Sequence, residues 1–276
     1  MTEVDMTSYL NRAKMTELFA TRLTELLEHS GFLITELGWE NVLRDSKKMR
    51  SLIHKRVAAK VYKKSPAALM VKFMPDCLGI YPQIEGDKGI FLFDAKISIT
   101  PVFFPKHIER IRRSARLPEL RREDAGEIER EAWDVYNEFY PKARVAIFLA
   151  SPYHPRLIVG EWVSKTLCIY RHRRDRLPES GGSGTPPVNI HLGKMRSIEG
   201  FLEDEFGVRL GSPLRELKEF IKTWVVSKPP GRVNWTQYNN AIRELRERCP
   251  WLRERRPTKI DPAQISLKDY GLISRK

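Results

Sequence analysis

Residues 89–100 read Gly-Ile-Phe-Leu-Phe-Asp-Ala-Lys-Ile-Ser-Ile-Thr, and this stretch predicts a β-strand with two chemically different faces. Side chains alternate between the faces of a strand. One face is therefore apolar and comprises Phe91, Phe93, Ala95, Ile97 and Ile99. The opposite face is polar and comprises Asp94, Lys96, Ser98 and Thr100. We expect the apolar face to pack in a core, which leaves a carboxylate and an ammonium group side by side on the other face.

A second strand is expected upstream, over residues 77–81, and a turn over residues 85–89 separates the two strands. Strands joined by such a turn run antiparallel. Asp76, which directly precedes the upstream strand, should therefore lie opposite Asp94 or within a few residues of it. Two carboxylates at that distance repel each other. A hard divalent cation such as Mg²⁺ or Mn²⁺, which prefers oxygen ligands, would relieve the repulsion.

The neighbours of Asp94 complete the expected metal site. The backbone carbonyl of Ala95 is a further expected ligand. Lys96 would lie beside the metal, where it can orient an attacking water or help to deprotonate it, and can stabilise charge on a phosphate. Together these groups are suited to the hydrolysis of a phosphodiester bond.

The pair of motifs Pro75-Asp76 and Asp94-Ala95-Lys96 resembles the signature of the PD-(D/E)xK nuclease superfamily, and Pro-Asp occurs only once in the chain. The resemblance covers about residues 15–150. It implies that Asp76 and Asp94 bind Mg²⁺ or Mn²⁺ and that Lys96 assists the nucleophilic water. It also implies cleavage of DNA, with RNA left open as a substrate, to give a 3′-hydroxyl and a 5′-phosphate.

Many members of that superfamily add an acidic residue from the first helix. Glu25 is the candidate here, because it lies at the edge of the apolar stripe of a helix expected over residues 14–30, near the core yet able to reach a cleft. Glu40 and Asp45 compete for the same role.

The resemblance implies an α/β fold, a restriction-endonuclease-like mixed sheet flanked by helices in the order α-β-β-β-α-β. The hydrophobic periodicity agrees with that order. Helices are expected over residues 14–30, 40–61 and most of 107–140, the last broken near residues 117–118. Strands are expected over residues 32–37, 69–73, 77–81, 89–100, 145–150, 157–163 and 165–170. Gly31 provides a stop for the first helix.

The composition describes a basic protein with a sizeable core. The chain has 276 residues, a net charge of +14 and 41% hydrophobic residues, and such a charge favours nucleic acid as the partner. Three scattered cysteines indicate a reducing compartment. No apolar run reaches the length of a membrane span. We therefore expect a cytoplasmic protein without a membrane, with a nucleoid-associated or viral context left open.

Three parts are expected along the chain: a nuclease core over residues 1–178, a flexible loop or linker over 179–187, and a basic helical C-terminal module over 188–276. The linker is rich in Gly, Ser and Pro. The module would contain helices near residues 194–206, 213–226 and 234–248. Residues 181–276 contain 18 Lys and Arg against 11 Asp and Glu. The module could therefore contact nucleic acid or a protein partner, and a homodimer is compatible with double-strand cutting.

Two clusters of cationic side chains allow two interpretations each. Arg171, Arg173 and Arg174 follow an expected strand, and four arginines follow the expected catalytic strand: Arg110, Arg112, Arg113 and Arg116. Either cluster could contact phosphates or form a solvated surface. The alternative to a nuclease is a non-catalytic nucleic-acid-binding or assembly protein.

Overall fold

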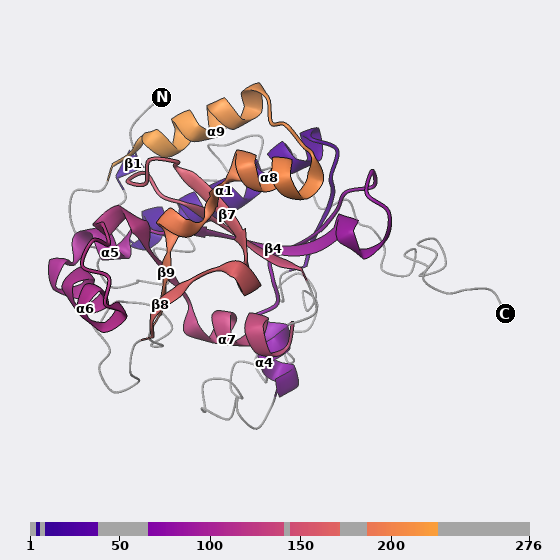
Figure 1. Cartoon of the computed structure of the whole chain (residues 1–276). Helices are drawn as coiled ribbons and strands as arrows, with labels where there is room; N and C mark the ends of the chain where they lie inside the picture. The colour runs from indigo at the N-terminus through magenta and orange to yellow at the C-terminus, as the bar shows by residue number, and fades with distance from the viewer. Residues whose placement is uncertain (1–3, 6–8, 38–65, 141–143, 172–186, 226–276) are drawn as a thin grey trace. The chain divides into compact units, whose positions relative to one another are not determined.

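The computed structural model describes residues 4–5, 9–37, 66–140, 144–171 and 187–225 (Figure 1). These residues belong to one compact unit, Met1–Val233. The helices expected over residues 40–61 and 234–248 lie outside the described residues, as do Glu40 and Asp45. None of the helices in the described ranges is long and apolar enough to cross a membrane.

The described unit is an α/β fold built on a six-stranded mixed sheet. Its strands lie in the order β10 (Arg196–Ser197), β7 (Ile158–Trp162), β6 (Val145–Ala150), β4 (Ile90–Ile97), β3 (Cys77–Ile80) and β2 (Leu33–Glu36). Strands β2, β3 and β4 pair antiparallel, whereas β6 pairs parallel with β4. A parallel pair needs a crossover connection, and the chain between β4 and β6 supplies helices for it. The mixed sheet with flanking helices confirms the predicted α/β class.

Helix α1 (Tyr9–His29) ends where the sequence predicted. Gly31 adopts a positive φ of 93°, which glycine adopts without a steric penalty. The amide of Gly31 donates to the carbonyl of Glu28, and the amide of Phe32 donates to that of Leu27. This is a Schellman motif, and it turns the chain directly into β2.

The apolar face of β4 forms an aromatic core. Phe91 and Phe93 are each 1% exposed, and α1 packs against this strand. Further rings close the core: Phe32, Tyr81, Phe148, Trp162, Phe201 and Phe206. Phe201 and Phe206 come from α8 (Ile198–Phe206), which packs against β7. The predicted apolar face is therefore confirmed.

A second core adjoins the polar face of β4. It combines apolar side chains of β6 with those of α7 (Arg130–Glu138), α4 (Pro66–Lys72) and β9 (Val188–His191). Helices α4 and α7 lie side by side (Figure 1). Strand β9 is the central strand of a separate three-stranded sheet, in the order β5 (Ala125–Ile128), β9 and β8 (Cys168–Arg171). Asp94 projects toward this side of the six-stranded sheet.

The strand expected over residues 69–73 is wrong, because this segment belongs to helix α4. Pro66 provides a favourable start for a helix, and alanine, leucine and methionine, which follow it, are strong helix formers. The amide of Phe73 donates to the carbonyl of Leu69, and both side chains are buried in the second core. The spacing of four residues places them on one helical face.

The region 107–140 is helical only at its two ends. Helix α5 (Thr100–Phe103) leads into α6 (Pro105–Ala115), and α7 completes the region. Between α6 and α7 the chain forms β5, which the sequence did not predict. Strand β5 pairs with β9, about sixty residues further along. A pairing of such long range leaves no local periodic signal.

Residues 188–225, which we assigned to a separate helical module, instead complete the core unit. Strand β9 joins the three-stranded sheet, β10 extends the six-stranded sheet, and α9 (Ser212–Lys222) packs against α1. Two of the expected helices are present as α8 and α9. The predicted boundary at residue 187 is wrong for this segment, because its strands and helices pack against elements that precede it.

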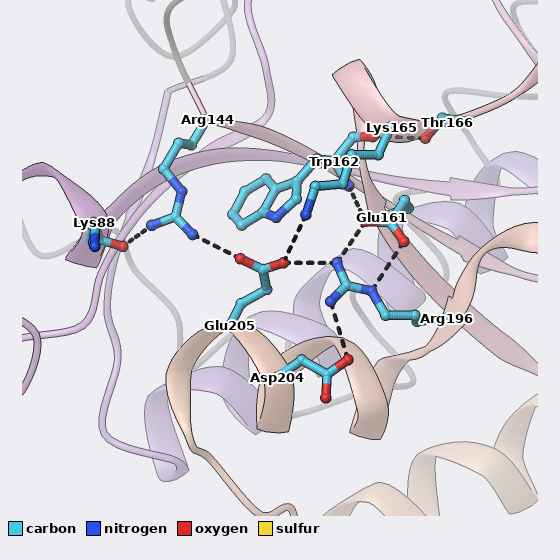
Figure 2. Close-up of polar contacts among 9 residues, drawn as sticks. All are labelled: Lys88, Arg144, Glu161, Trp162, Lys165, Thr166, Arg196, Asp204 and Glu205. Atoms are coloured by element: carbon cyan, nitrogen blue, oxygen red, sulfur yellow. Dashed lines mark hydrogen bonds and ion pairs between the residues drawn. The ribbon is translucent and has the colours of Figure 1, made fainter.

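Charged side chains attach α8 to the edge of the sheet (Figure 2). Glu205 accepts from Arg144 at 3.1 Å, Arg196 at 2.9 Å and Lys165 at 3.4 Å. Arg196 also binds both carboxylate oxygens of Glu161 on β7, at 2.6 and 3.0 Å, a bidentate geometry that favours strong pairing. The Arg144 guanidinium stacks 4.3 Å above the Trp162 ring. Glu205 is therefore the shared acceptor for three cations.

Replacement of Glu205 by Gln should destabilise the folded state by about 1–2 kcal/mol, the range for charge-assisted hydrogen bonds reduced for partial exposure. Urea unfolding followed by circular dichroism measures the change. Glu203→Gln on the same helix is the matched control, because Glu203 and its partner Arg209 are 51% and 86% exposed. This control should change stability by less than about 0.5 kcal/mol; equal effects would contradict the assigned role of Glu205.

The stabilisation by Glu205 should depend on pH. Burial alone would raise its pKa, but hydrogen bonds from Trp162 and Arg196 and the nearby Lys165 hold the pKa below the ordinary value. A depressed pKa in the folded state contributes stability that is complete above the pKa of the unfolded chain and is lost as the pH falls. The difference between wild type and Glu205→Gln should therefore be full at pH 7 and shrink in acid. A difference that grows in acid would contradict this assignment.

Candidate active site

Asp76 and Asp94 face each other across two adjacent strands. Cys77 pairs with Phe93 in the antiparallel register of β3 and β4, so the preceding residue, Asp76, lies opposite Asp94. This is the arrangement predicted from the turn between the strands. The two carboxyl groups approach within hydrogen-bonding range of each other.

Lys96 contacts both carboxylates. Its Nζ lies 3.1 Å from Asp94 Oδ2 and 3.7 Å from Asp76 Oδ2. Lys96 and Asp94 share the polar face of β4 because they are two residues apart. Burial alone would lower the pKa of Lys96, but the charges of Asp76 and Asp94 outweigh burial and raise it. Lys96 is therefore a cation at neutral pH.

Asp94 is the buried member of the group, with an exposure of 1%. The hydroxyl of Tyr136 on α7 donates to Asp94 Oδ2 at 2.7 Å, the same oxygen that Lys96 approaches. Burial would raise the pKa of Asp94, but Lys96 and the hydrogen bond from Tyr136 hold it below the usual value. Asp94 Oδ1 is also buried, and no donor among the described residues reaches it.

Asp76 is the accessible carboxylate, and 43% of its side chain is exposed. Its Oδ2 accepts from the backbone amide of Ala95 at 3.4 Å. Partial burial and the facing charge of Asp94 raise its pKa, while Lys96 opposes the rise. Lys96 is also accessible, with 33% of its side chain exposed. A phosphate can thus approach the two outer groups while Asp94 stays buried.

The oxygen atoms at this site are of the kind that a hard divalent cation prefers as ligands. Asp76 and Asp94 supply two carboxylates, and Asp94 Oδ1 is a buried acceptor that needs a positive partner. The amide of Ala95 points toward Asp76, and because the amide and carbonyl of one strand residue face the same neighbour, the Ala95 carbonyl is directed to the same side. Within the described ranges, no group of three or more His, Cys, Asp or Glu residues is placed to hold a metal. Two carboxylates and a carbonyl are the oxygen donors that the described residues would offer to such an ion.

The structure does not bring Glu25 into this group. Glu25 lies on α1 and pairs with Arg22 at 3.3 Å. Helix α1 packs on β4 from the apolar side, since Thr24 lies beside the thiol of Cys77, which pairs with Phe93. Asp94 projects from the other side of the sheet. No contact in the described part of the chain joins Glu25 to either aspartate.

The proposed phosphate-contacting arginines are described only in part. Arg171 ends β8, and its guanidinium pairs with Asp134 of α7 at 3.1 Å. Its charge is therefore partly neutralised within the protein. Arg173 and Arg174 lie outside the described residues.

Two site residues had no signal in the sequence. Tyr136 reaches Asp94 from α7, 42 residues further along the chain. Glu129, the residue before α7, contributes negative charge that raises the pKa values of Lys96 and Tyr136. Both depend on the packing of α7 against β6, which brings residues distant in sequence to the polar face of β4.

No protein-family model, curated protein or solved structure matches this chain. The functional assignment is therefore carried by its own residues and their geometry.

The Tyr136–Asp94 hydrogen bond can be tested without any assumption about function. Tyr136→Phe should destabilise the protein by about 1–3 kcal/mol, because it leaves a buried carboxylate with one donor fewer. A double-mutant cycle with Asp94→Asn should give a coupling free energy of about 0.5–3 kcal/mol. Denaturant unfolding of the four proteins measures it.

Tyr140→Phe is the matched control for Tyr136→Phe, because Tyr140 follows the same helix and is only half-buried. Its cycle with Asp94→Asn should show no coupling. A zero coupling for Tyr136 as well would contradict the hydrogen bond.

Proposed function

We propose that this chain is a metal-dependent endonuclease of the PD-(D/E)xK type that hydrolyses phosphodiester bonds, with DNA as the first substrate and RNA as the alternative. The observation that carries the proposal is the convergence of Asp76, Asp94 and Lys96 at one accessible point of the sheet. The basic charge of +14 supports a polyanionic substrate. A protein that binds through the C-terminal part of the chain and a second copy of the chain are further candidate partners.

In this proposal the buried Asp94 and the accessible Asp76 bind the metal ion from opposite sides. Asp94 would hold Mg²⁺ or Mn²⁺ through its free Oδ1, and Tyr136 would keep that carboxylate in a single orientation. Asp76 would bind the same ion from the accessible side. When bound, such an ion lowers the pKa of a coordinated water and polarises the phosphate. The Ala95 carbonyl is the third protein ligand in this proposal.

Lys96 acts as a cation in the proposed mechanism. Asp76 and Asp94 raise its pKa, and a third of its side chain is accessible. As a cation it would donate to a phosphate oxygen and stabilise the negative charge that develops during attack. Orienting the attacking water or helping to deprotonate it is the other role that the sequence suggests.

The sheet topology supports the same proposal. The elements α1, β2, β3, β4, α7 and β6 follow the order that the PD-(D/E)xK resemblance implies, with α4 inserted between β2 and β3 and further elements between β4 and β6. The first acidic residue directly precedes β3, and the second acidic residue and the lysine lie on β4. A central strand is well suited to a catalytic site, because packing on its other face holds it rigid.

One observation favours a second candidate, a non-catalytic nucleic-acid-binding protein. Lys96 already contacts both carboxylates and neutralises part of their charge. In that case the three residues form an internal salt bridge that stabilises the end of β4.

Cleavage of DNA distinguishes the two candidates. The wild-type protein should nick or linearise plasmid DNA with Mg²⁺ or Mn²⁺ and not with EDTA, and should leave 5′-phosphate ends. Asp76→Asn and Lys96→Gln should each lower the rate by at least about 100-fold, since each removes a group that acts on the transition state. Asp76→Asn is the safer variant for folding because its side chain is half-exposed.

Asp87→Asn is the matched control, because Asp87 is exposed and lies between β3 and β4 at the opposite end of the hairpin from the site. This variant should cleave at the wild-type rate. Binding of DNA without cleavage under any metal condition would favour the second candidate.

Metal binding can be measured separately from cleavage, through its effect on thermal stability. Mn²⁺ at about 100 times its dissociation constant should stabilise the wild-type protein by about 2.7 kcal/mol, which is visible as a higher melting temperature. Asp76→Asn should lose most of this gain, whereas Asp87→Asn should keep it. An identical Mn²⁺ response in the wild type and Asp76→Asn would contradict the metal site.

A further inference from the structure

Helix α6 and the seven residues that follow it concentrate positive charge. Residues 105–122 contain seven Lys or Arg and two Glu, a net charge of +5 in eighteen residues. This is more than a third of the net charge of the whole chain. A density of this kind is costly through self-repulsion unless a polyanion offsets it.

The inner face of α6 is apolar and fixes the helix in place. Ile108 and Ile111 are fully buried against Leu120, Ala125 and Ile169. These partners come from the segment before β5, from β5 itself and from β8. The rotational orientation of α6 is therefore determined by packing, which also determines which side chains face outward.

The outward side chains form one row. Lys106, Arg110 and Arg113 are exposed and follow the spacing i, i+4, i+7, which places them on one helical face, opposite Ile108 and Ile111. In the described part of the chain, no acidic side chain pairs with Lys106 or Arg110, and Arg113 donates only to the backbone carbonyl of Glu109. We call these three residues the α6 row.

Arg112 shows the contrast within the same helix. It donates to the carbonyl of Leu120 at 2.7 Å and pairs with Glu109 at 2.6 Å. The Arg112 guanidinium is therefore paired within the protein, whereas the charged groups of the α6 row face solvent.

A chain of contacts links α6 to the candidate catalytic strand. His107 lies 3.3 Å from Glu127 of β5. The amide of Glu127 donates to the hydroxyl of Ser98 at 3.1 Å. Ser98 follows β4 on the same face as Lys96. The start of α6 is thus connected through two side chains to the end of the strand that carries Asp94 and Lys96.

We propose that the α6 row binds the phosphate backbone of a nucleic-acid duplex whose scissile bond lies at the Asp76–Asp94–Lys96 site. The row rises about 10 Å along the helix axis, which matches about three base-pair steps of a duplex. Phosphate contacts of this kind position a substrate without reading its sequence. The inference deepens the proposed nuclease function, since it states where the substrate backbone lies.

The test is the salt dependence of binding by the full chain in EDTA, so that no cleavage occurs. Fluorescence anisotropy with labelled 30-base-pair DNA and RNA duplexes, at 50–250 mM NaCl, compares the wild type with the triple variant K106Q/R110Q/R113Q. Each lost phosphate contact lowers the slope of log K against log salt by about 0.9. The triple variant should therefore lose about 2–3 from the slope and bind at least about 10-fold more weakly at 100 mM NaCl.

The matched control is R209Q/R215Q/K222Q, which removes the same charge from exposed positions on and before α9. Its slope should stay within about 1 of the wild type. Equal slopes for wild type and the α6 variant, equal losses in both triple variants, or no duplex binding by the wild type would each overturn the inference. Polyglutamate binding that depends on the α6 row, without duplex binding, would instead indicate an acidic protein partner and would overturn it too.

The outcome is separable from the nuclease proposal. Loss of duplex affinity in the α6 variant supports the binding surface even if no condition yields cleavage. Metal-dependent cleavage that the α6 variant retains at wild-type affinity supports the nuclease and overturns the surface.

Discussion

The burial of one carboxylate, Asp94, constrains the arrangement around it. An isolated charge in a protein interior costs several kcal/mol, and only close ion pairs and hydrogen bonds offset that cost. Lys96 is supplied by the same strand, and Tyr136 is supplied by α7. Helix α7 must therefore pack against β6 at a definite position, because a shift of one turn would leave the carboxylate without its hydroxyl donor. Stability and the geometry of the candidate site rest on the same contacts.

One face of β4 packs in the core, and the other face carries the residues of the candidate site. Phe91 and Phe93 bury one face in an aromatic core with α1 and α8. The other face presents Asp94 and Lys96 toward α7, at the point where β3 begins and Asp76 is still exposed. A rigid apolar layer behind the strand keeps the polar layer in place. This explains how charged groups can lie on a central strand of a sheet whose neighbouring strand, β6, is buried throughout.

Charge is used in three different ways in the described part of the chain. At the edge of the sheet, Glu205 gathers Arg144, Lys165 and Arg196, and these contacts attach α8. At the end of β4, the acids outnumber the base, and Asp94 Oδ1 lacks a donor. Along α6, cations project into solvent. With Glu161 and Asp204, which also pair with Arg196, the first group has three acids and three cations. The second group has an excess of negative charge and the third an excess of positive charge. A cation and a polyanion are the partners that would complete the last two.

The sequence alone determined the local features of this protein. Alternation in residues 89–100 predicted which face of β4 packs in the aromatic core, Gly31 predicted the end of α1, and the turn after β3 predicted that Asp76 faces Asp94. Each of these depends on neighbours within about twenty residues. The tertiary structure alone decided the role of Tyr136, the β5–β9 pairing, the helical state of residues 69–73 and the place of residues 188–225 in the core. These features depend on burial against segments that are distant in the sequence. Such long-range burial produces no periodic pattern in the local sequence.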